Sequence, residues 1–88
     1  SLELQQAELT YQQAKERLSV TEKMVTVAEE ATRLARIRFK EGVILSSDLI
    51  DFETRLSDAK ARHLNANASY QVAIANLRRV SGLDQFSM

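Results

Sequence analysis

Small and apolar residues, spaced alternately three and four positions apart, run along nearly the whole chain and are interrupted once, between residues 39 and 51. This spacing places side chains along one face of an α-helix. The positions before the interruption are Leu4, Ala7, Tyr11, Ala14, Leu18, Thr21, Val25, Ala28, Thr32, Ala35 and Phe39, and those after it are Leu49, Phe52, Leu56, Ala59, His63, Ala66, Tyr70, Ala73, Leu77 and Val80. We call these two sets the seam. Two long helices folded back on each other would bury both sets, so the sequence predicts an all-α, antiparallel coiled-coil hairpin.

Gly42 lies inside the interruption and marks the turn of the hairpin. We expect the first helix at about residues 2–41, the turn at 42–46, the second helix at about 47–81 and a short tail at 82–88. Glycine suits the left-handed residue that follows a helix, and Ser46 or Ser47 suits the N-cap of the next helix. Gly82 repeats the stop signal at the far end. The chain is therefore predicted to be a single helical hairpin and a fragment of a larger protein.

The composition favours long helices and excludes several functional classes. Proline is absent, glycines number two, and the 12 basic and 12 acidic side chains cancel. The balanced charge argues against a nucleic-acid partner. The absence of cysteine excludes disulfides and thiolate metal sites. We predict no cofactor, no metal site and no catalytic residue, so the chain is not expected to be an enzyme.

A second apolar stripe lies beside the seam on each helix. Its members are Val20, Met24, Val27, Ala31 and Leu34 on the first helix, and Ile50, Ala61, Leu64, Ala68 and Ala75 on the second. A lone hairpin can bury one stripe per helix, so the second would stay exposed. We expect lateral helix packing through Val20, Met24, Val27, Leu34 and Leu64, in a four-helix bundle or in the wall of a helical barrel, and self-association of the isolated chain.

The register of the two helices follows from the sizes of the seam residues. Placing large residues opposite small ones puts Leu18 beside Ala73 and Val25 beside Ala66. Shifting this register by half a heptad would also keep the seam residues of the two helices facing each other.

His63, the single histidine, occupies a seam position. A pH-sensitive layer is one interpretation, but no cysteine, second histidine or carboxylate at the right spacing accompanies it to form a metal site. We favour a partly buried side chain that finds a hydrogen bond.

Asp48 and Asp51 lie one turn apart where the second helix begins. Paired carboxylates can perform acid–base chemistry, but no nucleophile or pocket is predicted beside them. Helix capping and favourable interaction with the helix dipole explain both residues, and an acidic patch at a partner surface or pore mouth is the alternative.

The turn carries three bulky apolar residues, Val43, Ile44 and Leu45, where a purely structural connection would be polar. Either one or two of them fold back onto Phe39 and Leu49, or the turn docks onto another protein.

The pattern Phe39-x-x-Gly42, followed by Asp48-x-x-Asp51, by heptads through Leu56, Ala59, Ala66, Tyr70, Ala73 and Leu77, and by Ser81-Gly82, resembles the periplasmic helical hairpin of TolC-like outer membrane efflux proteins. The likeness covers about residues 4–82. It implies one coiled-coil hairpin of a periplasmic tunnel in a homotrimer whose outer-membrane barrel lies outside this chain. Such proteins export drugs, or proteins by type I secretion, together with a periplasmic adaptor (membrane fusion) protein and an inner-membrane pump.

The resemblance also assigns roles by position. Gly42, Val43, Ile44, Leu45, Ser46 and Ser47 would form the tip that docks the adaptor, and Asp48 and Asp51 would line the channel entrance. Some members have Tyr in place of Phe39 and Arg in place of Ile44, and these residues hold the entrance shut through hydrogen bonds. Phe39 and Ile44 cannot form such bonds, so an apolar contact is expected at this tip.

Two alternatives belong to other classes. The hairpin of an adaptor protein is also long and antiparallel, but its tip carries Arg, Leu and Ser at set spacing. A stand-alone coiled-coil dimerisation module is the other alternative.

Overall fold

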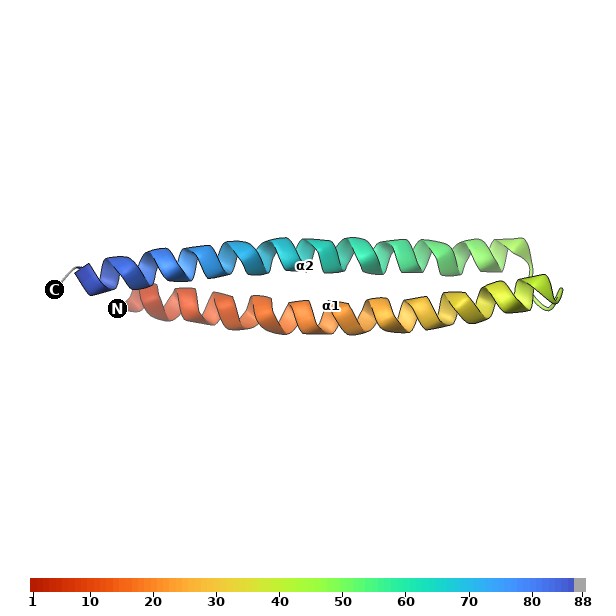
Figure 1. Cartoon of the computed structure of the whole chain (residues 1–88), viewed down its shortest axis with the longest axis horizontal. Helices are drawn as coiled ribbons and strands as arrows, with labels where there is room; N and C mark the ends of the chain where they lie inside the picture. Colours follow the sequence, from red (N-terminus) through yellow and green to blue (C-terminus); the bar gives the residue numbers. More distant parts are fainter. Residues whose placement is uncertain (87–88) are drawn as a thin grey trace.

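The computed structural model describes residues 1–86, which form two antiparallel α-helices, α1 (Leu2–Lys40) and α2 (Ser46–Phe86), joined by a turn at residues 41–45 (Figure 1). The Ser1 side chain caps α1 by accepting a hydrogen bond from the Leu4 backbone N–H at 3.2 Å. The predicted all-α hairpin is confirmed. Its Cα extents of 69 × 13 × 13 Å are those of a rod in which each helix has the other as its neighbour.

α2 continues beyond Ser81, where the sequence predicted its end. Among the described residues Gly42 is the glycine with a positive φ, so Gly82 adopts helical dihedral angles. Glycine permits a left-handed conformation but does not require one, and within a helix it costs only about 1 kcal/mol relative to alanine. The predicted tail is therefore helical over 82–86, and residues 87–88 lie outside the described part.

Gly42 closes α1 in the way the sequence predicted, with φ of 76°. Its N–H donates to the carbonyl of Phe39 at 3.0 Å, and the Val43 N–H donates to the carbonyl of Arg38 at 2.9 Å. These two bonds form a Schellman motif, which satisfies carbonyl groups that the end of the helix leaves free. The chain thus leaves α1 in a defined direction and returns toward α2.

Replacing Gly42 with alanine is expected to destabilise the hairpin by about 1–2 kcal/mol, because an L-residue pays that cost in the left-handed region. An added Cβ would meet nothing within 4 Å at either glycine, so the effect is purely conformational. Gly82→Ala is the matched control and is expected to be neutral or stabilising. Urea unfolding followed by circular dichroism measures both free energies of unfolding. Equal effects of the two substitutions would contradict the role of the left-handed turn.

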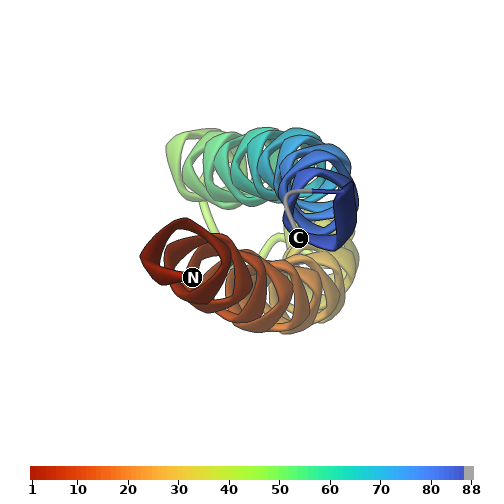
Figure 2. The ribbon, with the colours of Figure 1, turned by 90° about the vertical axis from the view of Figure 1, so that its left-hand side faces the viewer.

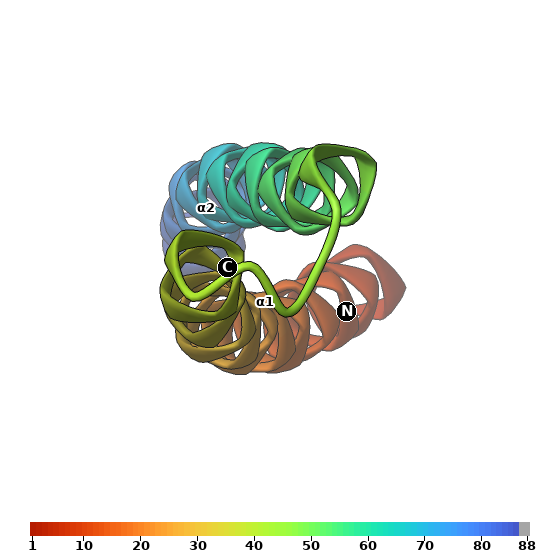
Figure 3. The ribbon, with the colours of Figure 1, turned by 90° about the vertical axis from the view of Figure 1, so that its right-hand side faces the viewer.

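Small residues make up most of the buried seam. The residues with the least exposure are Ala7, Ala14, Thr21, Thr32, Ala35, Leu56, Ala59, Ala66, Ala73 and Val80. Alanine lets the two backbones approach closely along the whole length of the hairpin. Views from either end show the helices winding around each other (Figures 2 and 3), as expected when a seam repeats every 3.5 residues on average.

The register differs from the one that residue size favoured. The side chains of Thr21 and His63 are hydrogen-bonded at 3.1 Å, and the rings of Tyr11 and Tyr70 stack with centroids 5.7 Å apart. Val25 therefore lies level with Ala59 rather than with Ala66. The predicted register is wrong by one heptad, and the shift by half a heptad is not observed either. Pairing of polar and aromatic seam residues, rather than alternation of large and small ones, distinguishes the observed register from the predicted one.

Candidate functional site

The turn end of the hairpin presents an apolar surface. Val43 and Leu45 are 66% and 70% exposed, whereas Ile44 is half-buried. Ile44 lines a small cavity of about 170 Å³ together with Leu34, Ala35 and Phe52, among others. One of the three turn residues thus folds back toward the helices, beside Leu34, Ala35 and Phe52, and the other two are exposed to solvent. Gly42, Ser46 and Ser47 are exposed beside them.

Asp48 stabilises the start of α2. Its Oδ2 accepts a hydrogen bond from the Leu45 backbone N–H at 3.1 Å. The Leu45 carbonyl in turn accepts from the Leu49 N–H at 3.2 Å, so Leu45 stands at the N-cap position. The predicted N-cap at Ser46 or Ser47 is wrong, because Asp48 reaches back to the cap residue as the third residue of a capping box does. The capping role expected of Asp48 is confirmed.

Asp51 lies one helical turn beyond Asp48, and both side chains are exposed at the turn end. Their negative charge interacts favourably with the N-terminal dipole of α2. Two carboxylates and an apolar turn surface therefore share one end of the rod.

An ion pair joins the two helices close to this end. The Arg36 guanidinium donates to both carboxylate oxygens of Glu53, at 2.8 and 3.1 Å. Hydrogen bonding to Arg36 lowers the pKa of Glu53 below its ordinary value, and the same contact raises the pKa of Arg36. The bidentate geometry holds the first turns of α2 against the last turns of α1.

We expect hairpin stability to fall when the pH drops below about 4.5, the ordinary pKa of this carboxyl group. Because the pKa of Glu53 is lower in the folded state than in the unfolded state, the stabilisation is complete above the unfolded value and is lost as pH falls through the folded one. Thermal unfolding at pH 7 and pH 3 measures the change. The Glu53→Gln variant should lose less stability between the two pH values than the parent. Glu30→Gln, which removes the exposed pair with Arg33 inside α1, should behave like the parent, and a Glu53→Gln variant indistinguishable from it would contradict the assignment.

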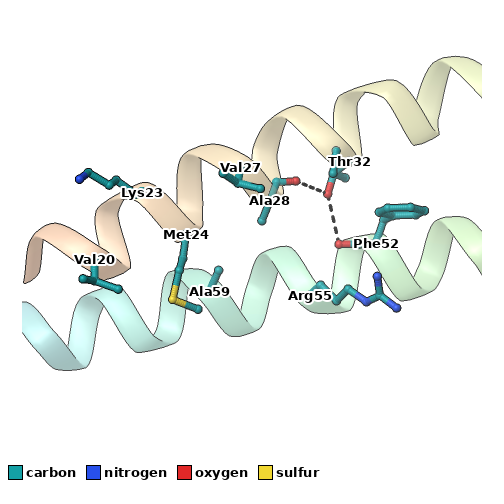
Figure 4. A pocket seen from close by; sticks show the side chains of 10 residues that line it. Val20, Lys23, Met24, Val27, Ala28, Thr32, Phe52, Arg55 and Ala59 are labelled. Carbon is teal, nitrogen blue, oxygen red and sulfur yellow. Dashed lines mark hydrogen bonds between the residues drawn. The ribbon is translucent and has the colours of Figure 1, made fainter. Parts of the chain in front are cut away.

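A shallow apolar groove of about 570 Å³ runs along one flank of the hairpin and shares Phe52 with the small cavity beside the turn. The α1 stripe residues Val20, Met24, Val27 and Ala31 line it, together with Phe52, Arg55 and Ala59 of α2. Figure 4 shows Met24 extending across the groove toward Ala59. Val20 and Val27 are 51% and 69% exposed, and Met24 and Leu34 are exposed too. The structure thus leaves the α1 part of the second stripe open to solvent.

The α2 part of the second stripe lies on the other side of the molecule. Successive residues of an α-helix are about 100° apart, so Leu64 points about 180° away from Arg55, which lines the groove. Leu64 is 71% exposed and Ile50 is exposed on the same helix. The hairpin therefore carries one apolar stripe on α1 and another on α2, facing in roughly opposite directions.

His63 is half-buried in the seam and its Nδ1 lies 3.1 Å from the Thr21 hydroxyl. The expectation of a hydrogen-bonded seam histidine is confirmed. Within residues 1–86 no group of three or more histidine or carboxylate side chains is placed to hold a metal ion. Over the same residues, neither helix has a stretch that is long and apolar enough to cross a membrane.

Sequence reasoning missed the Arg36–Glu53 pair and the α2 residues of the groove. Both depend on the axial register, that is, on which residues of α1 and α2 lie side by side. The polar seam residue His63 was the signal that could have fixed this, since a partly buried imidazole needs a hydrogen-bond partner across the seam. It finds that partner in the Thr21 hydroxyl at 3.1 Å.

The comparisons with known proteins give one match. Neither a curated protein nor a solved structure matches the chain. The family model described as "Outer membrane efflux protein" matches residues 2–83, which is nearly the whole sequence. A hairpin with an apolar turn end and two opposed apolar stripes fits this match, and the chain belongs to the outer membrane efflux protein family.

Proposed function

We propose that this hairpin is a segment of the periplasmic helical tunnel of an outer membrane efflux channel, packed side by side with neighbouring hairpins. This proposal rests on the pair of exposed apolar stripes that face in opposite directions. A stripe on a single face would pair two copies across a two-fold axis and leave no exposed apolar stripe for a third copy. Stripes on opposite sides let the α1 stripe of one hairpin meet the α2 stripe of the next, and the contact can repeat around a ring.

The register supports level packing of such neighbours. Val20 precedes Thr21 by one residue and Leu64 follows His63 by one, so the two exposed side chains stand at the same height on opposite sides of the rod. Leu34 and Ile50 are likewise two residues from the contact between Thr32 and the Phe52 carbonyl. When the turns of adjacent hairpins point the same way, large apolar residues of one stripe meet those of the next at two levels.

The turn end is proposed to dock the periplasmic adaptor protein, with Val43 and Leu45 as the main contacts. The homotrimeric assembly, the inner-membrane pump and the export of drugs or proteins belong to the same proposal, through family membership. Exposure of two bulky apolar side chains supports it, because a turn with no partner would bury them or replace them with polar residues.

Asp48 and Asp51 are proposed to line the channel entrance. Repetition by symmetry would form a ring of carboxylates, which concentrates cations and repels anions. Asp48 serves the helix start as well, so one residue would combine a structural and an electrostatic role.

Replacing both aspartates with asparagine in the full-length channel should reduce its preference for cations over anions, by roughly twofold to tenfold. Asparagine retains an oxygen that can accept the Leu45 N–H, so the start of α2 is preserved. Asp58→Asn, which removes an exposed carboxylate paired with Arg62 farther along α2, is the control and should leave selectivity unchanged. Reversal potentials in planar bilayers provide the measurement. Identical selectivity of the double variant and the parent would restrict both aspartates to helix capping.

A further inference from the structure

A polar layer interrupts the seam about midway along the hairpin. Thr21 is only 5% exposed, and its hydroxyl lies 2.9 Å from the Arg17 carbonyl and 3.0 Å from the Leu18 carbonyl of the preceding turn. A hydroxyl donates one proton. When that proton goes to a carbonyl, the oxygen accepts from the Nδ1–H of His63 at 3.1 Å. Both side chains of the layer are then satisfied.

The apolar residues in the middle of the seam do not distinguish this register from the one shifted by one heptad. Alanines recur at seven-residue intervals on both helices. Val25 therefore meets Ala59 in the observed register and Ala66 in the shifted one. Leu56 likewise meets Ala28 or Ala35. The central layers of the seam therefore place the same kinds of aliphatic side chain together in the two arrangements, so another interaction is needed to select between them there.

His63 does distinguish the two registers. In the shifted register it would stand level with Ala28, which offers no side-chain hydrogen bond. A partly buried imidazole without a partner loses the bond it could make to water and gains none in return. The observed register gives His63 a partner in the Thr21 hydroxyl across the seam.

We propose that the Thr21–His63 pair sets the register of this hairpin. The pair acts as a single buried polar position does in other coiled coils, where it selects one alignment among several that apolar packing would allow. It thereby fixes the height of Val20 relative to Leu64. The proposal does not depend on the tunnel function, since it concerns the alignment of α1 and α2 in a single chain. The competing explanation is that the turn at Gly42 alone sets the alignment.

Cysteine pairs introduced into this cysteine-free chain can report the register. Val25→Cys with Ala59→Cys reports the observed register, and Val25→Cys with Ala66→Cys reports the shifted one. Each pair is combined with the transplant Thr21→Ala/Ala28→Thr, which moves the threonine by seven residues to the level that His63 would occupy after the shift. Oxidation in a redox buffer at high dilution, followed by mass spectrometry, gives the yield of intramolecular disulfide.

The parent should form the 25–59 disulfide in preference to the 25–66 disulfide. The transplant should lower the ratio of the two yields by about tenfold or more, as expected for the exchange of one buried hydrogen bond. Thr26→Ala/Ser19→Thr is the matched control, because it moves an exposed threonine by the same interval and should leave the ratio unchanged. A helical transplant that keeps the parent ratio would overturn the proposal.

A second variant covers the case in which the transplant fails to fold. Thr21→Val/His63→Leu makes the layer apolar and keeps the seam continuous, so helix formation is retained. Its disulfide ratio should move toward one, because neither register then satisfies a polar pair. If this variant keeps the parent ratio, the turn alone sets the register and the role assigned to the polar layer is wrong.

Discussion

Replacing Val43 and Leu45 with aspartate is expected to abolish efflux by the full-length channel while the helix content of the hairpin stays the same. Both side chains point to solvent at the end of the rod, so neither substitution removes a packing contact within the chain. An adaptor docked on this surface would have to bury two unpaired carboxylates, which is strongly unfavourable. Each loss of about 1.4 kcal/mol weakens binding tenfold, so the two substitutions together should eliminate a functional complex.

Drug susceptibility of cells that carry the variant as their sole efflux channel measures this effect, with the amount of channel in the outer membrane checked in parallel. Leu83→Asp is the control. Leu83 is also exposed, at 55%, but it lies near the end of α2 that is far from the turn. The control should retain resistance. Full resistance of the Val43→Asp/Leu45→Asp variant would exclude these side chains as the docking surface.

Substituting Val20 or Leu64 with aspartate is expected to convert the isolated chain from an oligomer to a monomer. The two residues belong to different stripes, and a head-to-tail contact requires both. Burial of a valine or leucine side chain contributes about 1.5–3 kcal/mol, and several stripe residues contribute along each contact. A carboxylate in the middle of the stripe reverses this gain because it must be desolvated without a partner.

Static light scattering across a concentration series measures the molar mass of each variant against the 9.9 kDa of one chain. Val43→Asp is the control, because Val43 is 66% exposed but lies in the turn, outside either stripe. It should associate as the parent does. A parent chain that is strictly monomeric at high concentration would contradict the role of the stripes in lateral packing.

The features that repeat along the chain could be predicted from the sequence. The seam, the two long helices, the left-handed Gly42 and the exposed second stripe all follow from spacing and residue type. Helix periodicity fixes which residues share a face, whatever the partner is. It does not fix which residues of two helices lie level.

The axial register of the two helices, that is, which of their residues lie side by side, accounts for most of what the sequence did not reveal. The preference for large opposite small failed because an alanine stands in either register beside Val25 and Leu56. The Arg36–Glu53 pair crosses from one helix to the other and could not be identified without the register. The different fates of Ile44 and its two neighbours depend on the path of the turn, which the Schellman motif at Gly42 directs. Gly82 predicts an end of α2 that the structure does not have, because glycine permits helical dihedral angles as readily as left-handed ones.

The central claim is that hairpins pack side by side with their turns pointing the same way. Disulfide formation between two single-cysteine chains tests this claim most directly. One chain carries Val20→Cys and the other carries Leu64→Cys, and no other cysteine is present. Equal amounts are mixed and oxidised under conditions in which the chains associate, and the three possible disulfide-linked dimers are separated by mass. Head-to-tail packing of the α1 stripe on the α2 stripe predicts that the yield of the mixed dimer, linked between positions 20 and 64, exceeds the yields of both symmetric dimers. Predominance of the symmetric Val20–Val20 product would show that hairpins pair face to face through the groove, and would contradict the tunnel-wall account.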